Sequence, residues 1–306
     1  MERPFSVPIL FVIFNRPETE QIVFNEIKKI KPQKLFVTAD GPREGKKGEK
    51  EKCEAARKII DQIDWNCEVY KNYSDVNLGC KRGVSSGIDW FFKNVEQGII
   101  LEDDCLPNPT FFRFCEEILD RYRDDDRIGM VSGDNFQFGK IKNDYSYYFS
   151  RYSHIWGWAT WRRAWRAYDV NMALWPEVKG KKALSAVFNR DRDMLYWSLI
   201  FDDVYRGKVD AWDYQWSFTC FINSYLAVMP SRNLISNIGI GGVGATHTKN
   251  KSKFADMKIQ ELEFPLRHPG FVLRDAESDK IVQSDNYPFW RFIASRTLKK
   301  IKKMLS

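Results

Sequence analysis

The sequence has 306 residues, of which 43% are hydrophobic, and it is long enough for one large domain or two closely packed halves. This composition excludes a collagen, a coiled coil and a disordered chain. Six Lys and Arg residues after position 290 account for most of the formal net charge of +7, because the other 42 of the 48 basic residues are nearly balanced by 41 acidic ones. With so neutral a body, no nucleic-acid partner is expected.

The first hundred residues alternate short apolar runs with helical patterns, which is typical of parallel strands joined by helices. Strands are expected at 7–14, 35–38, 67–70 and 98–101, and helices at 18–30, 46–63 and 81–93. In the first helix, an apolar stripe is formed by Ile22, Val23, Ile27 and Ile30. No apolar run reaches the roughly 18 residues needed to cross a bilayer, and a cytoplasmic location is therefore expected.

The pattern changes after residue 105. A helix is expected at 109–122, a strand at 129–132, and further helical stretches near 182–205 and 214–225. The aromatic stretch 145–168 has no clear period, and the four glycines of 236–250 predict a mobile loop. Because no Pro/Ser-rich linker separates the parts, we expect a nucleotide-binding half at 1–104, an acceptor-binding half of the same domain at 105–286, and a basic amphipathic tail at 287–306.

An apolar strand at 99–101 runs directly into three carboxylates, those of Glu102, Asp103 and Asp104. Open α/β sheets bind their ligands at the carboxyl ends of parallel strands, and three adjacent acids repel one another unless a cation is present. A second acidic triplet at 124–126 follows a helix that carries several arginines, and that context indicates a solvated turn. The first triplet therefore predicts a site for Mn²⁺ or Mg²⁺, with phosphate and water as the other ligands.

The same strand carries a family resemblance. GIILEDDCLPNPTFFRF at 98–114 is similar to the E-D-D-x-x-x-x-P-x-F-F block of GT-A-fold glycosyltransferases, and RIGMVSGDN at 127–135 resembles the strand and acceptor-side turn that follow it. The chain looks most like the bacterial hemolytic-protein-like branch and the N-acetylglucosaminyltransferase I type, in the same order over about 250 residues. The resemblance implies an α/β fold of the Rossmann-like GT-A kind, with a mixed, mainly parallel sheet flanked by helices.

The resemblance also implies an activity and roles for the three acids. The activity is metal-dependent, inverting transfer of a hexosyl or N-acetylhexosaminyl group from a nucleotide-sugar, in particular a UDP-sugar. The acceptor would be a glycan or a lipid-linked sugar in surface polysaccharide synthesis. In this family the last acid of the triplet, here Asp104, coordinates the metal, while Asp103 faces the ribose and Glu102 faces the donor sugar.

Three further positions match the family's nucleotide pocket. Arg16 lies in VIFNRPE and Asp40 in VTADGPR. Asp40 can accept the ring N–H of uracil. An equal alternative is that Asp40 is a turn residue that caps the Gly-Pro pair after it. CKRGVSSGIDWFF at 80–92 resembles the helix that directs a basic side chain toward the nucleotide, and its register leaves Lys81 and Arg82 as alternatives.

The string WGWATWRRAW at 156–165 closely resembles the bacterial branch. Either Trp156 or Trp158 can form the face under a sugar ring. Arg162 and Arg163 can meet phosphate, with a surface position as the alternative. The other two tryptophans of the string are four residues apart and are expected in the core.

Inversion requires a carboxylate beside the acceptor hydroxyl. AWDYQW at 211–216 resembles the W-D-D-W segment that carries this base in the N-acetylglucosaminyltransferase I type, but it lacks the second acid. Asp213 is the expected base and Asp210 the fallback, and a simple helix N-cap is the alternative for Asp213. SNIGIGGVGATHT at 236–248 is similar to the family's loop that closes over the diphosphate, which makes Gly242 a phosphate contact. His247 can be a further metal or pyrophosphate ligand, and a structural histidine is the equal alternative.

Two other classes of protein remain open. A nucleotidyltransferase uses the same metal and a related fold, but it normally carries a Gly-rich phosphate loop directly after the first strand, where this chain has FNRPE. A carbohydrate-binding protein without activity would explain the eleven tryptophans but not the acids. The tail at 287–306 is expected to lie on an anionic membrane surface, on the inner face of the membrane, or alternatively to pack on the body.

Overall fold

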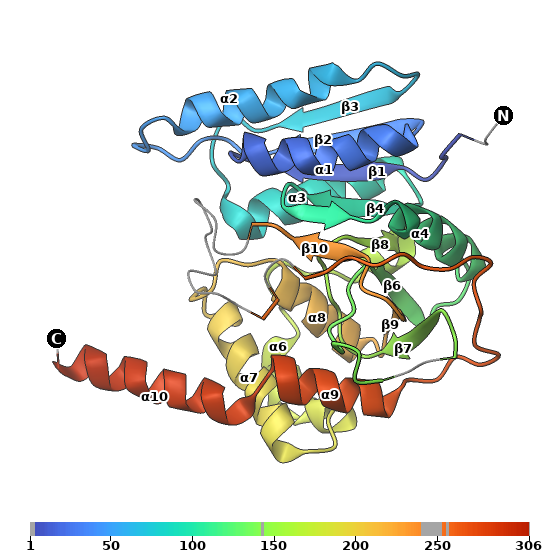
Figure 1. The fold of residues 1–306 in the computed structure, drawn as a ribbon. Helices are drawn as coiled ribbons and strands as arrows, with labels where there is room; N and C mark the ends of the chain where they lie inside the picture. Colours follow the sequence, from blue (N-terminus) through green and yellow to red (C-terminus); the bar gives the residue numbers. More distant parts are fainter. Residues whose placement is uncertain (1–3, 142–143, 240–252, 255–256, 306) are drawn as a thin grey trace.

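In the computed structural model, residues 4–141, 144–239, 253–254 and 257–305 are described, with side chains as far as residue 298. Figure 1 shows a central sheet of eight strands in the order β3-β2-β1-β4-β8-β6-β9-β7. In chain order the strands are β1 (Ile9–Ile13), β2 (Lys34–Ala39), β3 (Glu68–Tyr73), β4 (Gln97–Glu102), β6 (Ile128–Ser132), β7 (Tyr147–Ser150), β8 (Trp158–Trp161) and β9 (Leu226–Pro230). A small antiparallel sheet pairs β5 (Cys105–Pro107) with β10 (Ile235–Asn237).

The strands of the first half are all parallel, with β1 between β2 and β4. β8 then lies antiparallel between β4 and β6, β9 is parallel to β6, and β7 is antiparallel to β9. Six of the eight strands therefore run in one direction. The predicted α/β class, with a mixed, mainly parallel sheet flanked by helices, is confirmed, and the arrangement is consistent with a Rossmann-like GT-A fold.

Helices cover both faces of the sheet. The first four are α1 (Pro17–Ile30), α2 (Glu49–Ile59), α3 (Gly79–Asn94) and α4 (Pro109–Arg121). The others are α5 (Arg162–Trp165), α6 (Trp175–Gly180), α7 (Asp191–Tyr205), α8 (Asp213–Ile222), α9 (Ala276–Asn286) and α10 (Phe289–Leu305), with 3₁₀ turns at Ile60–Gln62 and Ala183–Ala186. Alternation along β1 sends Ile9 and Phe11 toward α1 and α4 and Leu10 toward α3, α5 and α8.

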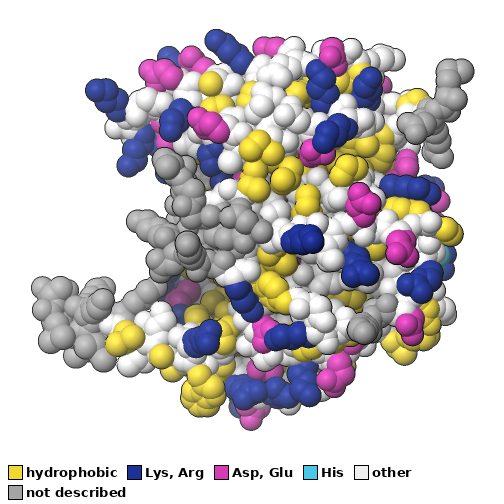
Figure 2. Space-filling view, in the orientation of Figure 1, with side chains coloured by type: hydrophobic (Ala, Val, Ile, Leu, Met, Phe, Trp, Pro, Cys, Tyr) yellow, Lys and Arg dark blue, Asp and Glu magenta, His cyan; other side chains and the backbone are white. Residues whose placement is uncertain are grey.

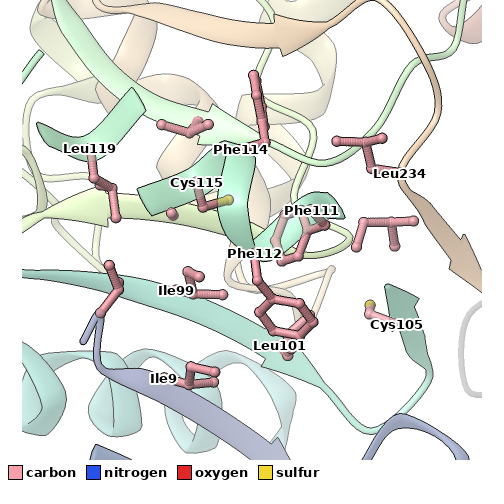
Figure 3. Close-up of a cluster of buried hydrophobic side chains, with 14 of the residues drawn as sticks. Ile9, Ile99, Leu101, Cys105, Phe111, Phe112, Phe114, Cys115, Leu119 and Leu234 are labelled. Carbon is pink, nitrogen blue, oxygen red and sulfur yellow. The ribbon is translucent and has the colours of Figure 1, made fainter. Parts of the chain in front are cut away.

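The face between the sheet and α4 fixes the strand that carries the acidic triplet. Figure 3 shows Phe111, Phe112 and Cys115 of α4 close to Ile99 and Leu101 of β4. All five side chains are fully buried. Truncating one such phenylalanine to alanine typically costs about 3–5 kcal/mol, so β4 is a stiff support for the residues at its end.

A third cluster of buried side chains lies beyond the sheet, between α6, α7, α8 and α9. Trp175, Trp197 and Phe201 are at its centre. The first turns of α10 also pack here, because Phe289 and Phe292 are partly buried against this cluster. No helix within the described part of the chain is both long and apolar enough to cross a membrane.

Several expectations need correction. In α1 the buried residues are Glu20, Val23, Phe24 and Ile27, whereas Ile22 is 45% exposed. The expected helix at 182–205 is interrupted, since a 3₁₀ turn precedes α7. The aromatic stretch 145–168 contains β7, β8 and α5. The expected halves 1–104 and 105–286 were assigned to one domain, and they share one sheet, with β1 to β4 in the first half and the other four strands in the second.

Candidate functional site

The site lies along the carboxyl edge of the parallel strands. β1 is followed by Arg16, β2 by Asp40 and β4 by Asp103 and Asp104. In Figure 1 the N-terminus is on the right and β1 runs to the left, so this edge faces left, where α3 also begins. Because β8 is antiparallel to β4, it is the amino end of β8, after Gly157, that reaches the same edge.

Arg16 lies between two acids of the triplet. Its guanidinium donates from Nη1 to Asp104 Oδ2 at 2.7 Å, from Nε to Asp103 Oδ2 at 3.4 Å, and from Nη2 to Asp103 Oδ1. The Asp103 side chain is 3% exposed, and it also accepts the backbone N–H of Phe14. Arg16 therefore supplies, inside the protein, part of the positive charge that the three acids require.

Glu102 is the most strongly perturbed of the three acids. Burial, with the negative charges of Asp104 and Asp103, raises the pKa of its carboxyl to about 8. Arg16 opposes this shift, and Asp213 adds to it from the other half of the chain. The acids of the two halves are thus close enough to influence one another's ionisation.

Cys80, at the start of α3, lies at the point on which these carboxylates converge. Burial, together with the negative charges of four carboxylates, raises the pKa of its thiol to about 12; the four are those of Glu102, Asp213, Asp210 and Asp40. The four come from three separate segments. Sequence reasoning did not single out Cys80, and a cysteine beside a glycine at a helix start gives no signal of its own.

The small sheet brings the segment around 235–239 over the triplet. β10 pairs with β5, and the N–H of Ile238 bonds the carbonyl of Asp104 at 2.9 Å. A Cβ on Gly239 would lie 2.3 Å from Asp104 Oδ2 and 2.6 Å from Arg16 Nη1. Only a glycine can approach this ion pair so closely. Gly242 and His247, which continue the same segment, lie outside the described residues.

Asp40 holds the turns that surround it. Oδ1 accepts the N–H groups of Gly41 and Leu78, and Oδ2 accepts those of Gly79 and of the Asn77 side chain, at 2.8 to 3.0 Å. A carboxylate has about four acceptor positions, and the chain itself fills four here. The geometry favours the alternative in which Asp40 is a turn residue over direct recognition of uracil.

Glycines allow α3 to lie close to β2. A Cβ on Gly87 would be 2.6 Å from the Thr38 side chain, and one on Gly83 would be 3.2 Å from Asp40. With Gly79 these residues recur at every fourth position, a pattern that could have been found in the sequence. Lys81 is half-buried and Arg82 exposed in the first turns of this helix, so both alternatives lie at the end of α3 that borders the site.

Asp210 and Asp213 have different settings. Asp210 accepts the backbone N–H groups of Cys80 and Lys81, each at 3.2 Å, and thereby caps α3 from a distance of about 130 residues along the chain. Asp213 is the first residue of α8, directly after the N-cap position Trp212, and is half-buried. Asp210 thus has a structural task, which favours Asp213 as the candidate base.

The expectation for Trp158 is wrong. Its side chain is fully buried, with ring centroids 5.6 Å from those of Trp212 and Trp216, so it offers no face to a sugar. Successive strand residues point to opposite faces, and position 158 points into the α3 and α8 side of the core. Trp156 is half-buried at the carboxyl edge and is the one of the pair that a ligand can reach.

Of the two alternatives for Arg162 and Arg163, phosphate contact or a position away from the site, the structure favours the second. Arg162 bonds the Val95 carbonyl and Glu96, and Arg163 bonds carbonyls at 122, 123 and 128. β8 runs antiparallel to β4, so these arginines lie at the edge of the sheet opposite the acids. A phosphate at the carboxyl edge is beyond their reach.

Two buried acids escaped the sequence reasoning. Neither carboxyl oxygen of Glu20 has a hydrogen-bond partner among the described residues, and burial with the nearby charge of Asp103 raises its pKa to about 9. Asp134, after β6, accepts the N–H of Trp156 at 3.1 Å, and burial raises its pKa well above the usual range. Burial lowers the pKa of the neighbouring His154 to about 3. An acid within an apolar helical stripe was the available signal for Glu20.

The donor set fits a hard divalent cation held partly by a ligand. Within the described ranges, no three His, Cys, Asp or Glu side chains are grouped so that they could hold a metal ion. Asp104 Oδ2 accepts from Arg16, whereas Oδ1 accepts the weak thiol donor of Cys105 at 3.4 Å and no other donor among the described residues. Mg²⁺ and Mn²⁺ are commonly bound through one or two carboxylates, with phosphate and water completing the shell.

Comparisons with known proteins extend to structure only. No protein-family profile and no curated sequence matches the chain. Among solved structures, HddC from Yersinia pseudotuberculosis aligns with TM-score 0.31 and 8% identity over 51% of this chain and 77% of its own. The 4-diphosphocytidyl-2C-methyl-D-erythritol synthase of Anaerococcus prevotii aligns with TM-score 0.31 and 10% identity over 52% of this chain and 74% of its own. Mouse xyloside xylosyltransferase 1 aligns with TM-score 0.36 and 11% identity over 70% of this chain and 81% of its own. Similarities of this size carry no information about the activity of this chain.

Proposed function

We propose that the chain is a glycosyltransferase that uses a divalent cation and a nucleotide-sugar donor. The observation that supports this most is the meeting of Glu102, Asp103 and Asp104 with Arg16 at the carboxyl edge, within electrostatic range of Asp213 from the second half. A donor diphosphate is an anion, and carboxylates dominate this edge. Extra positive charge is needed before such a donor can bind there.

The donor side of the site would be formed by the first half. Asp104 would hold Mn²⁺ or Mg²⁺ through Oδ1, and the ion would neutralise charge on the diphosphate as the leaving group forms. Asp103 and Glu102 would face the ribose and the donor sugar, as the family resemblance implies. Lys81 or Arg82, at the border of the site, would add positive charge. Asp40 would shape the pocket by holding α3 and its own turn.

The acceptor side would be formed by the second half. Asp213 would take the proton from the acceptor hydroxyl, whose oxygen forms a bond to the anomeric carbon. The bond from that carbon to the diphosphate oxygen breaks, and its electron pair leaves with the nucleoside diphosphate. Attack from the face opposite the leaving group inverts the anomeric configuration. Trp156 would lie under the acceptor sugar. The proposed donor is a UDP-sugar and the proposed acceptor a glycan or lipid-linked sugar of surface polysaccharide.

One assay separates this proposal from its two alternatives. We expect the protein with Mn²⁺ to release UDP slowly from a UDP-sugar without any acceptor, because water can replace the acceptor hydroxyl. A nucleotidyltransferase would instead release pyrophosphate from a nucleoside triphosphate and a sugar 1-phosphate. A protein that only binds carbohydrate would do neither, and either of these results would contradict the proposal.

A further inference from the structure

The helix α10 has two different faces, and only one of them is used by the body. Phe289 and Phe292 are partly buried in the cluster around α7, and the Phe292 and Tyr196 ring centroids are 4.6 Å apart. Arg296 forms an ion pair with Asp203 of α7. These contacts fix the first half of α10 against the protein, as the packing alternative for this segment predicted.

The other face of α10 exposes large apolar side chains. Trp290 is 72% exposed and Leu298 is 60% exposed, and the exposed Ala294 lies between them. In an α-helix these three positions fall within about 80° of one another, on the side away from Phe292. Trp290 is the only tryptophan of the eleven that is exposed, and indole rings at protein surfaces commonly mark contacts with partners or membrane interfaces.

Charge decides what kind of partner this face suits. From residue 291 onward the chain has six Lys and Arg and no Asp or Glu, while the rest of the chain is nearly neutral. Arg296 is paired with Asp203, and the sequence places five further basic residues on this helix, Arg291, Lys299, Lys300, Lys302 and Lys303. An exposed apolar stripe beside a dense positive charge is the pattern of helices that lie in the plane of an anionic membrane surface.

The shape of the molecule makes the face accessible. Figure 1 shows α10 extending beyond the body on the left, the side on which the carboxyl edge of the sheet lies. On the face drawn in Figure 2, basic and acidic side chains elsewhere on the body are interspersed. Among the described residues, the drawn face therefore shows no continuous basic groove or stripe of the kind that follows a nucleic acid.

We propose that the exposed face of α10 binds the surface of a membrane that contains anionic lipids, with Trp290 and Leu298 inserted at the interface and the basic side chains near the headgroups. The binding is reversible and independent of any activity. Its consequence for a lipid-linked acceptor, that transfer takes place at the membrane surface, rests on the function proposed above.

Vesicle flotation tests the proposal with the full-length protein and mixed phosphatidylcholine–phosphatidylglycerol vesicles. Each basic residue near an anionic surface is worth about a fivefold gain in affinity. Replacing Lys299, Lys300, Lys302 and Lys303 by Gln should therefore weaken binding by at least about 50-fold. The matched control replaces four exposed lysines of the opposite end of the molecule, Lys46, Lys47, Lys50 and Lys52, and should leave binding unchanged.

The apolar part of the face has its own readout. Lipids with brominated acyl chains should quench part of the tryptophan fluorescence of the bound protein, and Trp290→Phe should remove that quenching. Leu273→Ser, at another exposed leucine, should leave it unchanged. Salt at about 1 M, where the Debye length is about 3 Å, should weaken binding, and pure phosphatidylcholine should bind poorly.

Three results would overturn the proposal. The first is folded protein that does not float with anionic vesicles at low salt. The second is equal loss of binding in the two quadruple lysine variants, which would indicate unspecific charge attraction. The third concerns the variant in which the four lysines of α10 are replaced by Gln. If it loses affinity for double-stranded DNA while its affinity for vesicles is unchanged, the partner is a nucleic acid.

Discussion

Arg16 Nη1 lies 2.7 Å from Asp104 Oδ2, so a guanidinium is paired with the carboxylate that is expected to hold a divalent cation. The same guanidinium neutralises the almost completely buried Asp103. In the proposed function, Arg16 and a metal ion would both supply positive charge to these acids. This relationship links the stability of the fold to the proposed activity.

Removing Arg16 should make the fold depend on added cation. Breaking a buried ion pair by removing one partner typically costs about 3–5 kcal/mol, because a buried charge is left unpaired. Arg16→Met should therefore lower the melting temperature, and Mn²⁺ should restore more of it in this variant than in the wild type. The matched control is Arg127→Met, whose partner Asp125 is near the surface, and it should change the melting temperature far less. Equal Mn²⁺ effects on Arg16→Met and wild type would contradict the shared role.

Gly239 should be needed for the geometry of this pair. An alanine there would place its Cβ 2.3 Å from Asp104 Oδ2, so either the segment or the ion pair must move. We expect Gly239→Ala to weaken the binding of UDP with Mn²⁺ about tenfold or more in calorimetry. Gly180→Ala is the control, because a Cβ at Gly180 meets no atom within 4 Å. A Gly239→Ala protein that binds like the control would show that the close approach is not required.

Asp213 and Asp210 should separate catalysis from stability. Loss of a general base typically lowers the rate by about 10²- to 10⁴-fold, so Asp213→Asn should reduce kcat by that order while the affinity for donor hardly changes. Asp210→Asn should instead cost about 1 kcal/mol of stability through its contacts at the start of α3, and leave kcat within a few-fold of wild type. The opposite pattern, or a product with retained configuration, would assign the base elsewhere.

Glu20 should make stability fall with pH. Its pKa is raised from about 4.5 in the unfolded chain to about 9 in the fold, so between these values only the folded state keeps the proton. The free energy of unfolding should then fall by about 1.4 kcal/mol per pH unit on account of this group. Glu20→Gln should remove that dependence between pH 5 and about 9, as measured by urea unfolding. Parallel pH profiles of variant and wild type would show that Glu20 ionises normally.

The elements of the first half could be predicted because their signals are local. Buried strands such as β1 and β4 are short apolar runs, and turn residues follow them directly. The predicted buried face of α1 differs from the observed one. Residue type favours burial of the apolar Ile22 over the charged Glu20, whereas the helix buries Glu20 and exposes Ile22. Tertiary packing overrides residue type in such a case.

The site was harder to predict wherever it depends on contacts between distant segments. Nothing near Asp210 in the sequence indicates that it caps a helix about 130 residues away. The direction of β8 decides that Arg162 lies far from the acids and that Trp158 is buried, and an aromatic stretch without a period does not reveal a strand's direction. The acidic triplet was recognisable because a buried strand carries it.

The most direct test of the account is a calorimetric titration of UDP and Mn²⁺ onto Asp104→Ala, compared with Asp124→Ala at an exposed position of the second acidic triplet, 124–126. Both substitutions remove one aspartate from a run of acids, and circular dichroism should show that both proteins are folded. We predict that Asp104→Ala abolishes Mn²⁺-dependent UDP binding, while Asp124→Ala binds as the wild type does. Wild-type affinity in Asp104→Ala would contradict the assignment of the cation and the donor to this edge of the sheet.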